Sequence, residues 1–164
     1  KTTLVNALKK TKQFKDYNFA TERSQHLMSL GIPLNTDSTL KGQTVFLAER
    51  CGELMQDNII TDRTILDVMA FTMNAKSIPH QDKEAFETYA SEFVREYDYI
   101  FYISPYGLEI EDNGVRETDE HYRDLIDFTI TTLIKRHGHK AGTIEKISGS
   151  TEERIQQILN ITKL

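Results

Sequence analysis

Apolar residues recur along this chain at two spacings, one typical of helices and one typical of buried strands. In the longer windows the apolar positions repeat every three or four residues, which places them on one face of a helix. This spacing predicts helices over residues 2–12, 25–30, 41–55, 64–75, 81–97, 119–136 and 151–164. In the helix over 81–97, the residues expected to face inward are Phe86, Tyr89, Ala90, Phe93 and Val94.

Four shorter runs are dominated by apolar or aromatic residues. They predict strands over residues 17–20, 57–63, 98–103 and 143–147. The run over 98–103 is almost entirely apolar, as expected for a strand that is covered on both faces. Because strands and helices alternate, the pattern predicts one domain over residues 1–164, with a mostly parallel sheet between helices in a three-layer α/β/α fold.

Two acid–base pairs follow predicted strands. Asp62 and Arg63 end the run over 57–63, and Glu22 and Arg23 follow the run over 17–20. In an open parallel sheet the carboxyl ends of the strands form the ligand-binding edge, so both pairs are expected there. A carboxylate beside a guanidinium suits a metal-bound phosphate and its acceptor. The alternative is an ordinary helix cap, in which Asp62 or Thr64 serves the helix that follows.

The chain begins Lys1-Thr2-Thr3 and continues into an amphipathic helix. This is the tail of the phosphate-binding loop G-x-x-x-x-G-K-[ST], in which the lysine reaches the terminal phosphates and the hydroxyl ligates magnesium. The glycines of that loop do not occur before Lys1, so the pattern predicts a further strand and loop upstream. The alternative is that the lysine–threonine pair is a chance beginning.

Two features of the composition narrow the range of partners. A net charge of -5 argues against general attraction to nucleic acid or to an anionic membrane. No apolar run approaches the roughly 18 residues of a membrane span, and a cytoplasmic protein is expected.

The single cysteine, Cys51, has the spacing of a helix face and is interpreted as a core residue, with a reactive thiol as the less favoured alternative.

The segment over 106–123 combines a polar loop with the start of a helix, and it contains two arginines that could close over a nucleotide. Arg116 lies in the loop, whereas Arg123 lies in the helix, where a salt bridge within that helix is an equal alternative. The acids in reach of Arg123 are Glu120, Asp124 and Asp127. His137 and His139 are interpreted as a helix end and not as metal ligands, because no further ligands follow at suitable spacing.

The last helix is predicted to follow a tight turn at Gly149 and Ser150. Its start, Thr151-x-x-Arg154, lacks the acid of a full capping box.

Taken in order, these motifs resemble the P-loop kinase group. The closest likeness is to the AAA-domain family that includes the ribosylnicotinamide kinase portion of bifunctional NAD-biosynthesis enzymes and many phage nucleotide kinases. The resemblance spans nearly the whole chain and rests on residues 1–6, 62–67, 99–103, 112–116, 119, 123 and 153–154. It implies a P-loop NTPase fold, ATP and Mg2+ as cofactors, a lid around Arg116 and an adenine pocket near Gly149 to Arg154.

The hypothesis that follows is ATP-dependent phosphoryl transfer to a small nucleoside- or nucleotide-like acceptor. Catalysis would then come from holding donor and acceptor in line and from neutralising charge. Lys1 would contact the β- and γ-phosphates, Thr2 would hold magnesium, and Arg116 would stabilise charge on the transferring group. Either Glu22 or Asp62 would accept the acceptor's proton or organise the metal's water, with Arg63 steering the substrate.

Two other hypotheses stay open. The domain could hydrolyse or bind ATP to regulate a partner in a larger assembly, or it could be a scaffold without nucleotide, since fold does not decide function. The second acid–base pair, Glu22 and Arg23, favours a small-molecule kinase, because a plain ATPase needs no organised hydroxyl acceptor. The sequence leaves the acceptor's identity and any oligomerisation undecided.

Overall fold

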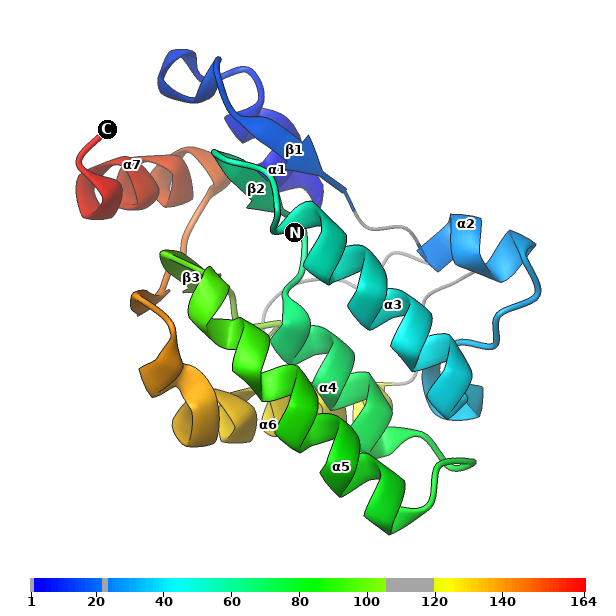
Figure 1. The fold of residues 1–164 in the computed structure, drawn as a ribbon. Coiled ribbons are helices and arrows are strands. Elements are labelled where there is room, and N and C mark those ends of the chain that lie inside the picture. Colours follow the sequence, from blue (N-terminus) through cyan, green and yellow to red (C-terminus); the bar gives the residue numbers. More distant parts are fainter. Residues whose placement is uncertain (1, 22–23, 106–119) are drawn as a thin grey trace.

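Four short strands, paired in parallel, lie among the helices of a computed structural model that describes residues 2–21, 24–105 and 120–164 (Figure 1). The strands are β1 (Asn18–Ala20), β2 (Ile59–Thr61), β3 (Tyr99–Tyr102) and β4 (Thr143–Lys146). Strands alternate with helices along the chain, and both strand pairs are parallel. The expected α/β class is therefore confirmed.

The helices of the described residues follow the predicted order, with bounds that differ by a few residues. They are α1 (Thr2–Leu8), α2 (Ser24–Ser29), α3 (Leu40–Glu53), α4 (Ile65–Asn74), α5 (His80–Ala90), α6 (Glu120–His137) and α7 (Thr151–Thr162). Four short 3-10 turns are η1 (Lys12–Phe14), η2 (Asn35–Asp37), η3 (Ser91–Glu96) and η4 (Gly138–Lys140). None of these helices combines the length and the apolar character that a membrane span requires in the described part of the chain.

The strands of the described residues form two separate pairs. β1 pairs with β2, in a register that joins Phe19 to Ile60, and β3 pairs with β4, in a register that joins Ile100 to Ile144. No ladder joins β2 to β3 in the described residues, so these four strands by themselves do not form one continuous sheet. The two parallel pairs agree with the mostly parallel sheet that the sequence predicts.

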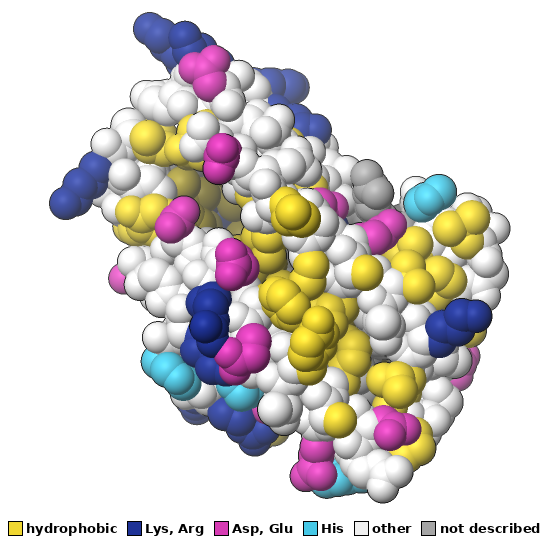
Figure 2. Space-filling model, in the orientation of Figure 1, with side chains coloured by type: hydrophobic (Ala, Val, Ile, Leu, Met, Phe, Trp, Pro, Cys, Tyr) yellow, Lys and Arg dark blue, Asp and Glu magenta, His cyan; other side chains and the backbone are white. Residues whose placement is uncertain are grey.

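Two apolar clusters hold the elements together. The larger one surrounds α4, which packs against α3, α5 and α6 and whose residues from Ile65 to Ala70 are all buried. The smaller one joins α1 to α7 through Leu4, Leu8 and Ile158, with partly buried side chains from the strands. Figure 2 shows apolar side chains gathered between α3 and α5 on one face, with charged side chains around them.

Three local predictions need correction. The helix expected over 81–97 ends at Ala90 and continues as η3, and Tyr89 is 64% exposed because Phe86 and Ala90 are the residues that face the core. The helix expected over 2–12 ends at Leu8. β3 is not covered along its whole length, since Tyr99 is 41% exposed.

The start of α7 does carry a full capping box, contrary to the sequence prediction. The cap is Ser150, one residue before the expected helix start, and its hydroxyl accepts from the Glu153 N–H while the Glu153 carboxylate accepts from the Ser150 N–H. Gly149 precedes it with φ +93°, and a Cβ there would lie 2.3 Å from Glu153 Oε2. This turn therefore requires glycine.

Candidate functional site

The first helix and the end of β2 meet through two side chains. Thr2 Oγ1 donates a hydrogen bond to Asp62 Oδ2 at 2.6 Å. Asp62 is only 3% exposed, and its backbone N–H donates to the Ala20 carbonyl at 2.8 Å, which extends the ladder beyond β2. The structure therefore brings together the two residues that the sequence assigned to a metal.

The donor chemistry of this pair fits magnesium. A hydroxyl and a carboxylate are hard oxygen ligands, and Mg2+ usually takes one or two carboxylates, with waters and substrate phosphates completing its octahedron. No cluster of three or more His, Cys, Asp or Glu residues with metal-binding geometry occurs in the described residues. A hydroxyl and one carboxylate leave most of the octahedron to waters and phosphates, so Thr2 and Asp62 suit a cation that arrives with a nucleotide.

The residues that follow Asp62 form a tight turn into α4. Arg63 has φ +83°, in the left-handed region that residues other than glycine rarely adopt. Its carbonyl accepts a hydrogen bond from Thr61 Oγ1 at 2.8 Å. Thr64 then caps α4, since its hydroxyl accepts from the Leu66 N–H while its own N–H donates to Asp67 Oδ2. The cap expected from the sequence is thus Thr64, and the Asp62 carboxylate bonds to Thr2.

The side chain of Arg63 lies against an aromatic ring. Its guanidinium carbon is 5.2 Å from the centroid of the Phe71 ring, a cation–π contact with the middle of α4. Phe71 in turn contacts the Tyr122 ring of α6, with 6.4 Å between the centroids. Arg63 is therefore anchored beside the start of α6.

Arg123 forms the local salt bridge that the sequence analysis offered as the alternative. Its Nε and Nη2 atoms both donate to Asp124 Oδ1 at 3.2 Å. A nucleotide contact by Arg123 stays a prediction.

Two buried residues beneath the turn were not predicted as part of the site. Arg50 of α3 donates from Nη1 to the carbonyls of Asp62 and Arg63, at 3.4 and 3.5 Å. The hydroxyl of Tyr97 accepts from the Ile65 N–H at 3.1 Å, and burial raises the pKa of this phenol above its ordinary value, so it stays protonated. A signal for Arg50 was present, because it interrupts the apolar face of its helix between Leu47 and Leu54.

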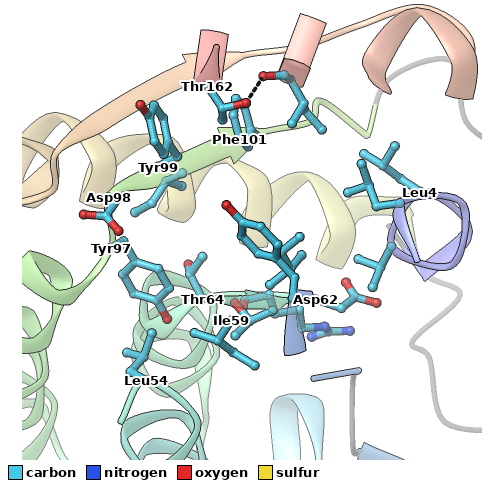
Figure 3. Close-up of a pocket in the computed structure, with 18 of the residues that line it drawn as sticks. Leu4, Leu54, Ile59, Asp62, Thr64, Tyr97, Asp98, Tyr99, Phe101 and Thr162 are labelled. Atoms are coloured by element: carbon cyan, nitrogen blue, oxygen red, sulfur yellow. Dashed lines mark hydrogen bonds between the residues drawn. The ribbon is translucent and has the colours of Figure 1, made fainter. Parts of the chain in front are cut away.

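A cavity of about 740 Å3 separates β2 from β3. Figure 3 shows Asp62 and Leu4 toward one end of it and Tyr97 and Asp98 toward the other. Both strands run in the same sense across this view, from Ile59 to Asp62 and from Asp98 to Phe101. The side chains that line its two faces come from α1 and α7 on one side (Leu4, Leu8, Ile158) and from α4 and α6 on the other (Leu66, Ile130, Ile134).

The strand edges that border this cavity carry backbone groups without a ladder partner in the described residues. Asn58 and Asp62 direct their peptide groups to β1, so the alternate residues Ile59 and Thr61 direct theirs to the cavity. On β3, the Asp98 carbonyl accepts from the Thr143 N–H, and the Tyr102 carbonyl accepts from the Ile147 N–H just after β4. The alternate residues Tyr99 and Phe101 therefore direct their peptide groups toward the cavity. The cavity is thus bordered by two open, parallel strand edges.

The residues expected to bind adenine lie on the connection from β4 to α7 and in the first turns of α7. Gly149 and Arg154 do not line the cavity, and the Nε atom of Arg154 is buried without a hydrogen-bond partner in the described residues. Thr3 is exposed on α1. The structure therefore groups Thr2, Asp62 and Arg63, and leaves the expected adenine-binding residues apart from them, at the start of α7.

Several predicted site residues lie outside the described residues. They are Lys1, Glu22, Arg23 and Arg116, together with most of the expected lid over 106–123. Their assigned roles stay predictions.

Comparison with known proteins identifies a family. A family model described as AAA domain matches residues 1–154. Neither the curated proteins nor the solved structures contain a significant match to this chain. The family match covers α1, all four strands and the start of α7, and so includes both residues of the Thr2–Asp62 contact.

Proposed function

Because the chain belongs to the AAA domain family, we propose that it is an ATP-dependent kinase that phosphorylates a small nucleoside- or nucleotide-like acceptor. The observation that carries the proposal is the contact between Thr2 and Asp62. A hydroxyl at the start of a helix and a buried carboxylate at the end of a parallel strand form the arrangement that nucleotide-binding P-loop proteins use around magnesium. The acceptor is a nucleoside, a nucleoside monophosphate or ribosylnicotinamide.

On the donor side, Thr2 and Asp62 would hold Mg2+, which when bound neutralises charge on the β- and γ-phosphates. Lys1 directly precedes Thr2 and would contact the same phosphates with its ammonium group. Arg116 would approach the transferring group from the lid and stabilise the charge that spreads over its oxygens in the transition state. These groups position and neutralise, and none of them forms a covalent intermediate.

On the acceptor side, Glu22 is the better candidate for the base. Asp62 is buried and already engaged by Thr2, which supports a role in organising the metal and its water. Glu22 remains as the carboxylate that would accept the proton from the acceptor hydroxyl. Arg63, anchored over Phe71, would steer the anionic or polar end of the acceptor.

The cavity between β2 and β3 supports a three-layer architecture for the complete domain. It has two open parallel edges and apolar side chains of two helices on each face, which are the surroundings of a buried strand. A parallel strand in that position would end beside Thr2. A short turn from there into α1 would place backbone N–H groups where they cradle a phosphate.

A second function fits the same family. An AAA domain could hydrolyse ATP, or bind it to regulate a partner, without any small-molecule acceptor. The kinase proposal is favoured by the second acid–base pair, Glu22 and Arg23, which gives an acceptor hydroxyl a base and a cation.

A substrate screen separates the two functions. ADP release by the full-length protein is measured with ATP and Mg2+ in the presence of nucleosides, nucleoside monophosphates or ribosylnicotinamide, and in a blank without acceptor. A kinase releases more ADP with its acceptor than in the blank. Equal release in all reactions would favour the ATPase, and no release with any acceptor would contradict both enzymes.

A further inference from the structure

The turn from Asp62 to Thr64 rests on one buried arginine, and we infer that Arg50 is a positioning residue for phosphoryl transfer. It acts through the backbone of Asp62 and Arg63, on whose carbonyls its Nη1 atom converges. The inference rests on the proposed function for its catalytic part. Its structural part concerns the shape of the turn and can be tested without a substrate.

The turn needs such support because Arg63 holds an unfavourable backbone conformation. At φ +83° the Cβ of a non-glycine residue is crowded. Such backbone strain persists only where neighbouring groups hold the residue in that conformation. Two donors meet on the Arg63 carbonyl: Arg50 Nη1 at 3.5 Å and Thr61 Oγ1 at 2.8 Å. Thr61 belongs to the strand that leads into the turn, whereas Arg50 reaches the turn from α3.

The conformation of Arg63 decides where the neighbouring functional groups lie. With this turn, the Asp62 carboxylate meets Thr2 and the Arg63 guanidinium lies over Phe71. A relaxed backbone at residue 63 would rotate both peptide planes and move these side chains relative to each other. Displacements of this kind at the reacting groups reduce turnover strongly even when the fold survives.

Arg50 is itself held in place by a buried ion pair. Its Nη2 atom donates to Glu53 Oε1 at 2.8 Å, and the two side chains are 7% and 10% exposed. A buried ion pair of this type often adds little to the free energy of unfolding, because apolar replacements can be equally stable. We therefore assign it a geometric role, which is to fix the orientation of the Arg50 guanidinium. The planar guanidinium holds Nη1 toward the two carbonyls and Nη2 toward Glu53 in one fixed geometry. The compact ammonium of lysine has three donors on a single nitrogen and does not reproduce this spread.

The catalytic test compares Arg50→Lys and Arg50→Met with the parent in the full-length protein. The matched control is Arg95→Lys, which changes an exposed arginine paired with Glu92. We expect Arg50→Lys to lower kcat about tenfold or more and to raise the Mg2+ concentration for half-maximal activity, as losses in an outer shell do. The KM for ATP and the melting temperature should stay close to the parental values. Parental kcat and Mg2+ dependence in Arg50→Lys would overturn the inference.

The structural test needs no activity and so separates this inference from the proposed function. In the parent, Arg63→Gly should melt at a higher temperature than Arg63→Ala, because glycine adopts φ +83° without strain. In the Arg50→Lys background this difference should shrink, because the turn is no longer held. An unchanged difference would overturn the inference whatever the activity, and failure of both Arg50 variants to fold would overturn it too, since Arg50 would then be structural.

Discussion

The hydroxyl of Thr2 lies 2.6 Å from the carboxylate of Asp62, although the two residues are 60 positions apart in the sequence. The contact joins the start of α1 to the end of β2 at a buried position. A hydroxyl donor in this place gives a buried carboxylate the hydrogen bond that it needs. In the proposed function, the same two oxygens would hold a magnesium ion that arrives with the nucleotide.

Removal of the Thr2 hydroxyl should therefore damage magnesium-dependent activity. We expect Thr2→Val to lower kcat/KM for Mg2+–ATP by about 10- to 100-fold, the usual effect of losing a group that orients a metal site. Thr2→Ser keeps the hydroxyl and serves as the matched control. Steady-state ADP release over a range of Mg2+ concentrations measures the effect, and a Thr2→Val protein that behaves like Thr2→Ser would show that the hydroxyl does not serve the metal.

Arg116 and Arg123 should differ in their effect on turnover. Arg123 already pairs with Asp124, whereas Arg116 is proposed to meet the γ-phosphate when the lid closes. Arg116→Ala should thus lower kcat much more than it weakens ATP binding, and Arg123→Ala should do less. Turnover kinetics combined with ATP binding by calorimetry decide the matter, and the reverse order of effects would identify Arg123 as the lid residue.

Glu87 should make the fold sensitive to acid. Burial raises the pKa of this carboxyl, but hydrogen bonds from His137 and Arg136 outweigh it and lower the pKa below its ordinary 4.5. A carboxylate with a lowered folded pKa stabilises the protein above its unfolded pKa, and this contribution is lost as the pH falls through the folded value.

Glu87→Gln should accordingly lower the melting temperature at about pH 7, and the difference from the parent should narrow as the pH falls below about 4. The control is Glu84→Gln, because the Glu84 side chain is 66% exposed and lies 3.5 Å from the exposed His80 ring. Thermal melts across this pH range give the result. A constant difference between Glu87→Gln and parent at every pH would rule out the ionised pair as its cause.

The open edges of β2 and β3 lead to a prediction about amide exchange. If a strand fills the cavity in the full-length protein, the amides of Thr61 and Phe101 become ladder donors and should exchange slowly with solvent deuterium. The amide of the exposed Asp57, outside both strands, provides a fast reference. Rapid exchange at Thr61 and Phe101 would show that the cavity stays open to solvent.

The sequence predicts the helices well because each has one buried face. α3 and α4 begin and end within a few residues of the expected positions, and so does α6. Helix ends are harder to predict, because single capping residues decide them. The capping box of α7 was missed because Ser150, and not Thr151, is the cap. Tyr89 was misplaced because periodicity alone does not show where the apolar face stops.

The candidate site was only partly predictable. Thr2 and Asp62 could be placed together because carboxyl ends of parallel strands gather at one edge of a sheet. The contacts of Arg50 and Tyr97 depend on how α3 and η3 pack against the turn, which no local pattern encodes. The direction of the Arg63 guanidinium depends on a positive φ at this residue. Nothing in the sequence around Arg63 predicts that conformation.

The most direct test of the central claim follows the γ-phosphate itself. Full-length protein is incubated with Mg2+ and ATP labelled at the γ-phosphate, together with the acceptor found by the screen, and the label is measured on the acceptor and as free phosphate. We predict that the label appears on the acceptor, that Glu22→Gln lowers this transfer by about 100-fold or more while ATP still binds, and that Asp62→Asn impairs transfer and hydrolysis together. Label released only as free phosphate, whatever acceptor is present, would contradict the kinase and leave an ATPase.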